Sequence, residues 1–444
     1  MLLARFFERV ITTGRLRIID AGGASHRVAG APGPSVAIRL HDRALHWKLV
    51  ARPRLYLPEA FVDGSLTIEE GSLYELVDLL ALNLEVLPDG VLSRLLNGSY
   101  TLLRRVHQYN PRSRARQNAA HHYDLSDQLY ALFLDPDRQY SCAYFGNGHD
   151  DLETAQLAKK RHIAAKLMIR PGHKVLDIGS GWGGLALYLA QECGADVTGL
   201  TLSVEQHQVA TRRAAAAGLS ERVRFRLRDY REEAGRYDRI VSVGMFEHVG
   251  VNHYGIFFAK LKSLLAAEGV ALLHSIGRMD GPGSTSPWIQ KYIFPGGYVP
   301  ALSEVAPMVE RQRLWITDIE ILRLHYARTL HAWRQRFEHN RQRIAALFDE
   351  HFCRMWEMYL VGSELAFRRG GLFVFQMQLA KSVDTVPLTR DYMFDWEREH
   401  SGSPYNAVAD RAIAAQTAAV EHVATDHAAL DRVAARNTTA DRAA

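Results

Sequence analysis

Hydrophobic and polar positions in the middle of the chain alternate between two kinds of segment. Short apolar runs that end in glycine or at a turn are typical of buried strands, and helical stretches separate one run from the next. The first pair is the strand and turn KVLDIGSG at 174–181, followed by a helix, LALYLAQECG, that ends in a glycine. Further strands are predicted at 196–202, 223–230, 237–246 and 269–277. Strands that alternate with helices predict a parallel sheet with helices on both faces.

The region before this pattern has a different organisation. Two short runs, VAIRL at 36–40 and HWKLV at 46–50, have a β-like composition and stand among turn signals. An apolar helix is predicted near Leu73–Leu84. Together these elements predict a small α+β domain with its own partial core.

The N-terminus predicts an amphipathic helix, because Leu3, Phe7 and Val10 fall at helical spacing. Its apolar side either packs on a core or contacts a membrane. Arg5 and Glu8 interrupt the apolar region that a signal peptide needs. No apolar run approaches the roughly 18 to 20 residues that span a bilayer. We therefore expect a cytoplasmic protein.

Two polar stretches mark the domain boundaries. A basic segment around Arg112 and Arg116, with a break at Asn110–Pro111, is either a solvated linker or a basic surface that faces lipid phosphates. The last sixty or so residues are rich in Ala, Asp, Arg and Thr, and we expect them to be partly helical or disordered. The predicted units are a small α+β domain at 1–110, a linker at 111–120, an α/β domain at 121–384 and an extension at 385–444.

Charge and cysteine content narrow the possible partners. The 54 basic and 49 acidic residues leave a net charge of +5, which does not argue for nucleic acid but suits visits to an anionic membrane surface. The cysteines Cys142, Cys193 and Cys353 are too far apart for a CxxC motif or a disulfide framework. His121 and His122 are adjacent, so they point in different directions. No metal site is predicted.

A glycine-rich turn follows the first strand of the repeating pattern. Asp177 ends that strand, and Gly179, Gly181 and Gly183 form the turn. Glycines let the backbone approach a ligand closely, and the following helix offers free N–H groups. Dehydrogenases share such a turn, but an acid before the first glycine is the methyltransferase form. In that form the turn receives the amino-acid end of S-adenosylmethionine.

The ends of the next two strands complete the predicted cofactor site. Thr201, Ser203 and Gln206 follow the second strand, where many methyltransferases place an acid for the ribose hydroxyls. Asp229–Tyr230 follows the next strand, where an adenine is usually held. Each could also be an ordinary loop residue.

Four further segments fit no generic methyltransferase. They are HHYDLSDQLYALFLDPDRQYSCAYF (121–145), DRIVSVGMFEHVG (238–250), LLHSIG (272–277) with KYIFPGGYVP (291–300), and LRLHYARTLHAW (322–333). Together they resemble the cyclopropane-fatty-acyl-phospholipid synthases and the mycolic acid cyclopropane synthases of mycobacteria, and the likeness covers roughly residues 115–382. The resemblance implies that the catalytic domain is a Rossmann-like class I S-adenosylmethionine-dependent methyltransferase domain with a mostly parallel seven-stranded sheet. It also implies that the small N-terminal α+β domain is lipid-associated.

The resemblance also implies two small ligands and the residues that hold them. This sequence departs from the family pattern at Ser363, where many relatives have a cysteine. A catalytic role proposed for that cysteine thiol cannot operate here. A bicarbonate ion beside the methyl group would be held by Cys142, Glu247, His274, the backbone of Ile276, and Tyr326. S-adenosylmethionine would be contacted by Tyr140, Ser141, Val175, Asp177, Gly179, Gly181, Gly183, Thr201, Leu202, Gln206, Asp229 and Tyr230.

The chemistry of adding a carbon to an alkene explains why a methyl donor and a bound base are both needed. An isolated alkene is a poor nucleophile, so the methyl donor must be a strong electrophile, as a sulfonium is. Attack leaves a carbocation on the lipid chain, and a proton must then leave the new methyl group for a ring to close. A bound bicarbonate can take that proton, with Glu247 as the group that accepts the proton from bicarbonate in turn. Water must be excluded, because it would capture the cation.

Simpler alternatives remain for the same residues. Cys142 could be a small buried hydrophobe, His274 a core histidine, and Glu247–His248 charges that cap a helix. A set of aromatic residues could line an acyl channel or pack in a core. These are Tyr140, Tyr144, Phe145, Trp288, Tyr292 and Phe294.

The expected reaction is transfer of a methylene from S-adenosylmethionine to the cis double bond of an unsaturated phospholipid chain, which forms a cyclopropane. The alternative is a fatty-acyl methyltransferase that gives a methyl-branched, methylene or furan-precursor chain. A non-catalytic lipid-binding protein is disfavoured by the intact glycine turn and by Glu247. A small-molecule N- or O-methyltransferase is disfavoured because it needs neither the bicarbonate residues nor the additional lipid-associated domain. The substrate implies peripheral contact with the inner face of the membrane, and the family implies a homodimer.

Overall fold

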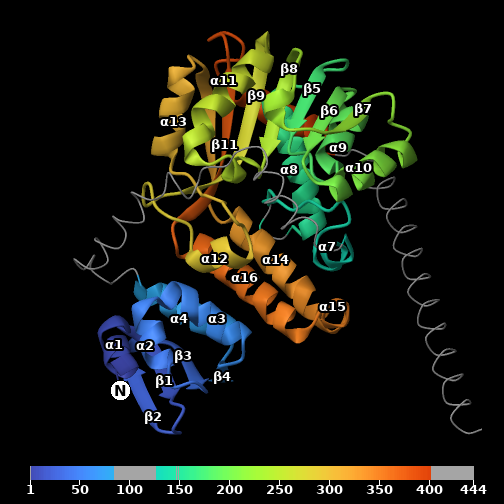
Figure 1. The fold of residues 1–444 in the computed structure, drawn as a ribbon. Helices are drawn as coiled ribbons and strands as arrows, with labels where there is room; N and C mark the ends of the chain where they lie inside the picture. Colours follow the sequence, from blue (N-terminus) through green and yellow to red (C-terminus); the bar gives the residue numbers. More distant parts are fainter. Residues whose placement is uncertain (1, 85–126, 147, 149, 402–444) are drawn as a thin grey trace, which may run out of the picture.

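The computed structural model describes residues 2–84, 127–146, 148 and 150–401 (Figure 1). These residues form an N-terminal domain, a large α/β domain and a layer of helices between them. None of the helices in these ranges is both long enough and apolar enough to cross a membrane. The predicted linker, the pair His121 and His122, and residues 402–444 lie outside the described residues.

The N-terminal domain is a small four-stranded sheet with helices packed on it, in the strand order β2-β1-β3-β4. The run at 36–40 lies in a strand, as predicted, and the predicted helix at 73–84 is confirmed. The strands are β1 (Thr13–Ile19), β2 (Ser25–Ala29), β3 (Ala31–Leu40) and β4 (Leu66–Glu70). The helices are α1 (Leu2–Val10), α2 (Leu45–Ala51), α3 (Pro53–Val62) and α4 (Leu73–Leu84).

Two sequence interpretations in this domain can now be decided. The apolar side of α1, which carries Leu3 and Phe7, is buried in the domain core, so the core-packing alternative is confirmed. The β-like prediction for 46–50 is wrong, because these residues belong to α2. Leu45 and Leu49 lie four positions apart, so a helix buries both on one side. A strand would also have buried Trp47, which is exposed.

The α/β domain is built on a sheet of seven strands within the described residues, in the order β10-β11-β9-β8-β5-β6-β7. The strands from β9 to β7 in this order are parallel, whereas β11 is antiparallel to both of its neighbours. The predicted fold class is therefore confirmed. The strands are β5 (Lys174–Ile178), β6 (Asp196–Thr201), β7 (Val223–Leu227), β8 (Tyr237–Val243), β9 (Leu265–Arg278), β10 (Trp315–Leu322) and β11 (Leu372–Ala380).

Alternate residues of the central strands enter two separate cores, one on each face of the sheet. Val175 and Val241 pack with α8 (Leu152–Leu167) and α9 (Gly184–Cys193). Their neighbours Leu176 and Ile240 pack on the other face with α11 (Tyr254–Leu264) and α13 (Leu302–Arg311). This period of two explains why the strands read as continuous apolar runs: both faces are buried.

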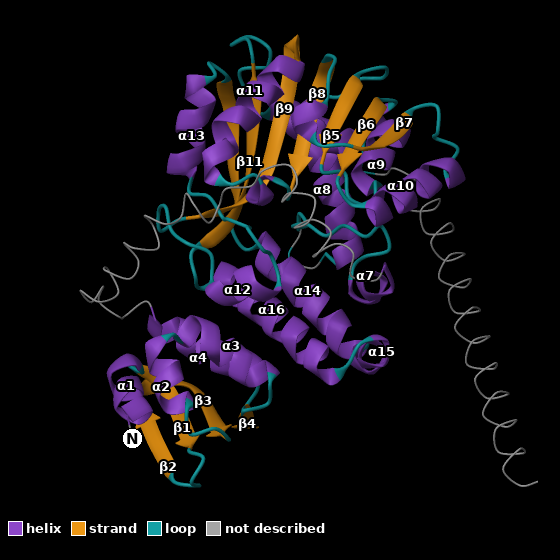
Figure 2. Cartoon of the chain, in the orientation of Figure 1, coloured by secondary structure: helices purple, strands orange, loops and turns teal. Residues whose placement is uncertain are grey.

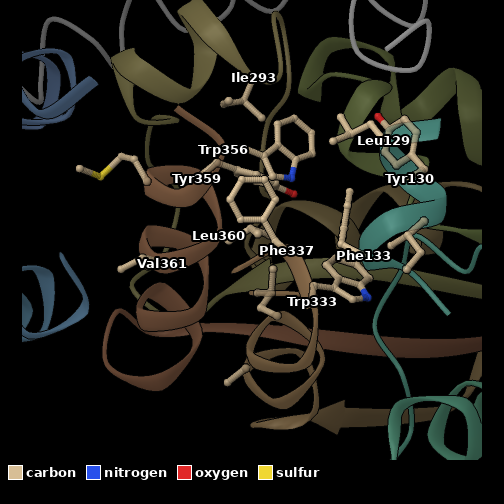
Figure 3. Packing of buried hydrophobic residues seen from close by; sticks show 14 of the residues in the cluster. Leu129, Tyr130, Phe133, Ile293, Trp333, Phe337, Trp356, Tyr359, Leu360 and Val361 are labelled. Atoms are coloured by element: carbon tan, nitrogen blue, oxygen red, sulfur yellow. The ribbon is translucent and has the colours of Figure 1, made fainter. Parts of the chain in front are cut away.

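A layer of helices lies between the sheet and the N-terminal domain (Figure 2). Its core is a cluster of aromatic and aliphatic side chains from α7, α14 and α16, with Ile293 from the end of α12 (Figure 3). We call it the aromatic cluster; it includes Tyr130, Phe133, Trp333 and Trp356. The helices are α7 (Asp127–Phe133), α12 (Pro287–Tyr292), α14 (His325–His339), α15 (Arg341–Leu347) and α16 (Glu350–Arg368).

The remaining helices connect the strands or follow the last one. Helix α10 (Val204–Ala216) packs beside β7, and α17 (Asp391–Glu399) lies on α8, where Glu397 is hydrogen-bonded to His162. The described part of the predicted extension thus packs on the α/β domain. Short 3₁₀ turns follow strands at Tyr230–Glu232, Phe246–His248 and Val251–His253.

Candidate cofactor and base site

A cavity opens at the carboxyl ends of the parallel strands. Its walls come from the ends of β5, β6 and β8, from the loop before α8, and from Pro295 and Gly296. This is the edge at which open α/β sheets bind ligands. Ten of the predicted cofactor residues line it: Tyr140, Ser141, Asp177, Gly179, Gly181, Thr201, Leu202, Gln206, Asp229 and Tyr230.

The turn after β5 requires glycine for steric reasons. Gly179 and Gly181 have φ values of +87° and +55°, which side chains rarely tolerate. A Cβ atom at Gly179 would also lie 2.9 Å from the Cβ of Met245. The turn therefore presents bare backbone to the cavity.

Asp177 places a buried carboxyl group in the cavity wall. Its side chain is buried, with the residue 2% exposed, and its Oδ2 has no hydrogen-bond partner among the described residues. Burial raises the pKa of this carboxyl to about 7. A buried, unpaired carboxylate oxygen fits a ligand that carries an ammonium group, as the amino-acid end of S-adenosylmethionine does. The site thus fits the cofactor that the sequence predicts.

Lys159 is a cavity residue that sequence reasoning missed. It lies on α8, is 1% exposed, and donates hydrogen bonds to Gln139 Oε1 at 2.7 Å and Ser141 Oγ at 2.8 Å. Burial lowers the pKa of this ammonium to about 8. Ser141 and Gln139 both line the cavity, so Lys159 fixes two of its wall residues. The pair Lys159–Lys160 resembles an exposed charged face in the sequence, and only the fold reveals that it is buried.

The loop after β6 lines the cavity and also caps the following helix, α10. Thr201 Oγ1 lies 2.9 Å from Gln206 Oε1, and both residues line the cavity. The Ser203 hydroxyl accepts the N–H of Gln206 and so caps α10. After β7, Asp229 accepts hydrogen bonds from Arg231. Ser203 therefore caps a helix and lines the cavity together with Thr201 and Gln206.

Two of the predicted cofactor residues do not line this cavity. Val175 lies inside β5 and is fully buried in the core between the sheet and α9. Gly183 caps the N-terminus of α9. A Cβ atom there would lie 2.6 Å from the ring of Phe225, so helix packing requires glycine at this position. The contact of these two residues with the cofactor stays a prediction.

Three of the predicted base residues, Glu247, His274 and Ile276, lie where β9 extends beyond β8. β8 ends at Val243, opposite His274, so the N–H of Ile276 has no strand partner on that side. This N–H donates to Glu247 Oε1 at 2.7 Å. In this structure that N–H is bonded to Glu247, and its contact with bicarbonate stays a prediction. The hydrogen bond fixes Glu247 beside His274 and Ile276 on the strand.

Glu247 and His274 each have one polar atom without a partner. They are 9% and 1% exposed, and neither Glu247 Oε2 nor His274 Nε2 has a hydrogen-bond partner within the described residues. His274 Nδ1 lies 3.2 Å from the side-chain nitrogen of Gln376, which donates, so the imidazole proton belongs on Nε2. Burial raises the pKa of Glu247 and lowers that of His274 to about 3. The site thus offers one unused acceptor and one unused donor.

Cys142 is buried within the aromatic cluster, and Tyr326 packs against it. Burial raises the pKa of the Cys142 thiol. Tyr326 lies on α14, with its ring against Trp333 and Phe367. Ile276 also packs on this cluster. None of the five predicted base residues lines the cofactor cavity itself.

The other predicted channel residues have mixed surroundings. Trp288 is part of the aromatic cluster, and Tyr140, Phe145 and Phe294 pack against it. Tyr144 also packs there and stacks between the rings of His162 and His325. Tyr292 bonds to the N-terminal domain.

Comparisons with known proteins point to one family. A family model described as mycolic acid cyclopropane synthetase matches residues 110–377, more than half of the chain. The tuberculostearic acid methyltransferase UfaA1 of Mycobacterium tuberculosis is 37% identical over 397 residues, which cover 85% of this chain and 90% of that protein. The cyclopropane-fatty-acyl-phospholipid synthase of Escherichia coli strain K12 is 42% identical over 263 residues, or 59% of this chain and 67% of that protein.

A solved structure agrees with this assignment. The mycolic acid cyclopropane synthase CmaA1, solved in complex with SAH and CTAB, matches with a TM-score of 0.58 at 33% identity. The match covers 61% of this chain and 99% of CmaA1. The family resemblance predicted from the sequence is confirmed, and the chain belongs to the mycolic acid cyclopropane synthetase family of S-adenosylmethionine-dependent lipid methyltransferases.

Proposed function

We propose that this enzyme adds a one-carbon unit to the cis double bond of an unsaturated phospholipid chain and closes a cyclopropane ring. The observation that supports the proposal is that Glu247 Oε2, a buried acceptor, and His274 Nε2, a buried donor, both lack a hydrogen-bond partner among the described residues. Bicarbonate complements both, because it has one O–H that donates and oxygens that accept. Leaving two such groups unpaired in a protein interior is costly, so a small polar ligand is expected there.

The chain's own residues have distinct roles in this proposal. S-adenosylmethionine, when bound, supplies an electrophilic methyl group. Asp177 holds its ammonium group, and Lys159 keeps Ser141 in place in the wall beside it. His274 donates to the bicarbonate, and Glu247 accepts its O–H and finally its proton. Burial raises the pKa of Glu247, which makes its carboxylate a better proton acceptor.

The aromatic cluster supplies the apolar side of the site. Cys142, Ile276 and Tyr326 border it, so it lies next to the base residues. We propose that the acyl chain enters along this cluster and that its side chains exclude water from the cation. A phospholipid substrate requires the enzyme to dock on the inner face of the membrane. A homodimer is the family-level expectation for its assembly.

Lipid analysis tests this function. The protein would be expressed in a host that lacks such an enzyme, and fatty methyl esters would be examined before and after mild hydrogenation. We expect a new ester one methylene heavier than the host's monounsaturated ester, unchanged by hydrogenation, because a cyclopropane survives conditions that reduce an alkene. A new ester that gains two hydrogens would overturn the ring assignment.

A second product is favoured by one comparison. The relative UfaA1 covers 85% of this chain, whereas the cyclopropane-forming relative from E. coli covers 59%. A methyl-branched or methylene chain is therefore the second candidate. Both products begin with the same cation, and the hydrogenation experiment separates them.

A further inference from the structure

One segment of the chain touches both the active site and the N-terminal domain. Residues 287–298, which we call the bridging segment, begin with α12 and follow β9. At one end, Pro295 and Gly296 line the cofactor cavity. The N–H of Tyr298 donates to the backbone oxygen of Glu247 at 2.9 Å. The position of this segment therefore affects the cavity wall and the proposed base residue together.

The other end of the segment is bonded to Glu59 on α3. Glu59 Oε1 accepts the Tyr292 hydroxyl at 2.9 Å and Lys291 Nζ at 2.8 Å. The side chain of Glu59 is 17% exposed, but that of Lys291 is 58% exposed. An exposed ion pair contributes little, so the half-buried Tyr292 bond is the more specific part. The ring of Tyr292 also contacts Trp288, which is buried in the aromatic cluster.

Backbone hydrogen bonds connect α12 to the turn that contains Pro295 and Gly296. The N–H of Phe294 donates to the oxygen of Ile289 at 2.8 Å, and the N–H of Gly297 donates to the oxygen of Phe294 at 3.0 Å. The Thr285 hydroxyl donates to the oxygen of Gly297 at 2.7 Å, which ties the turn down. A displacement at Tyr292 is therefore not absorbed by a loose loop before it reaches Gly296.

We infer that Glu59 is a positioning residue for the reaction, which acts through the bridging segment. The N-terminal domain then does more than associate with lipid: through Glu59 it holds the wall of the cofactor cavity and the backbone of Glu247 in their places. The catalytic part of this inference rests on the proposed function. The cofactor-binding part does not, because Pro295 and Gly296 face the cavity whatever the lipid substrate is.

The experiment compares two contacts between the same domains. Tyr292→Phe and Glu59→Gln weaken the contact to the bridging segment. Asp78→Asn is the matched control, since the Asp78 side chain is 14% exposed and bonds to Arg369, the residue that follows α16, outside that segment. The measurements on the full-length enzyme are the Kd for S-adenosylhomocysteine, kcat for lipid modification, and Tm.

We expect Tyr292→Phe to weaken S-adenosylhomocysteine binding and to lower kcat by about fivefold, the effect of one lost hydrogen bond. Glu59→Gln should act in the same direction, and the double variant should be no worse than Tyr292→Phe alone. Asp78→Asn should lower Tm as much while Kd and kcat stay within twofold of wild type.

Equal Kd and kcat in Tyr292→Phe and wild type would overturn the inference. Equal losses of affinity and of kcat in Tyr292→Phe and Asp78→Asn would also overturn it, because any contact between the domains would then have the same effect. If the wild-type enzyme modifies no lipid, the proposed function fails, and the Kd comparison still decides whether Glu59 positions the cavity wall.

Discussion

Replacing Glu247 with glutamine isolates the proton-accepting role from the structural one. The amide has the same shape, and its oxygen can still accept the Ile276 N–H that Glu247 Oε1 accepts at 2.7 Å. The change falls on Oε2, the atom without a partner among the described residues, which becomes an NH₂ group. The variant therefore keeps the hydrogen bond to Ile276 and loses the capacity to take a proton.

The expected effects on stability and rate differ in size. Burial raises the pKa of Glu247, so its charge destabilises the folded state as the pH rises above the ordinary carboxyl value. Glutamine removes that cost, and we expect the free energy of unfolding at neutral pH to stay equal or to rise by about 1 kcal/mol. A general base contributes about 10² to 10⁴ in rate, so kcat should fall by at least about 100-fold, or ~3 kcal/mol.

The assay needs a control with the same burial. Glu304 is also 9% exposed and takes no part in the proposed proton transfer; its Oε2 accepts the Ala301 N–H at 3.1 Å and the Tyr298 hydroxyl at 2.6 Å, and a glutamine oxygen can accept both. Glu304→Gln should keep kcat within about threefold of wild type. Rates are measured by mass spectrometry of modified phospholipid, and cofactor binding by calorimetry. A Glu247→Gln enzyme with wild-type kcat would refute the reasoning.

Three further predictions concern charge in the buried sites. Because burial raises the pKa of Asp177 to about 7, S-adenosylhomocysteine should bind with proton release near pH 6.5, and its affinity should fall below pH 7. Calorimetry in buffers of different ionisation enthalpy measures the release; a buffer-independent enthalpy would contradict it. Lys159→Met, which removes the donor to Ser141, should weaken that binding about tenfold, and unchanged affinity would exclude the role assigned to Lys159. Burial opposes charge on His162, but bonds to carboxylates, including Glu397, raise its pKa. His162 thus stabilises the fold below its ordinary pKa and loses this effect as pH rises through the raised value, so Glu397→Gln should lower Tm at pH 6 more than at pH 9.

The fold and the cavity could be predicted because they depend on local patterns. The strand that carries Asp177 is apolar on both faces, and the turn after it needs glycine at Gly179 and Gly181, so a short stretch of sequence contains the information. The antiparallel edge formed by β10 and β11 was not located, since these strands pair across about fifty residues of helices. The segment at 46–50 was misread because its alternation resembles a strand over so few residues.

The parts of the site that escaped prediction depend on contacts distant in sequence. Lys159 follows a helical pattern that gives no sign of burial, and its partners Gln139 and Ser141 belong to another segment. The N–H of Ile276 meets Glu247 only because β9 is longer than β8. Val175 is assigned to the cofactor by the family resemblance alone, and the pleat of β5 directs its side chain into the core.

The central claim, that a base beside the methyl group removes one of its protons, has a direct isotopic test. S-adenosylmethionine labelled with three deuterium atoms on the methyl group is supplied to the purified enzyme with unsaturated phospholipid vesicles, and the product chains are weighed by mass spectrometry. The account predicts two deuterium atoms in every added carbon. Retention of all three would mean that the proton leaves from the lipid chain, and would contradict a base held at the methyl group by Glu247 and His274.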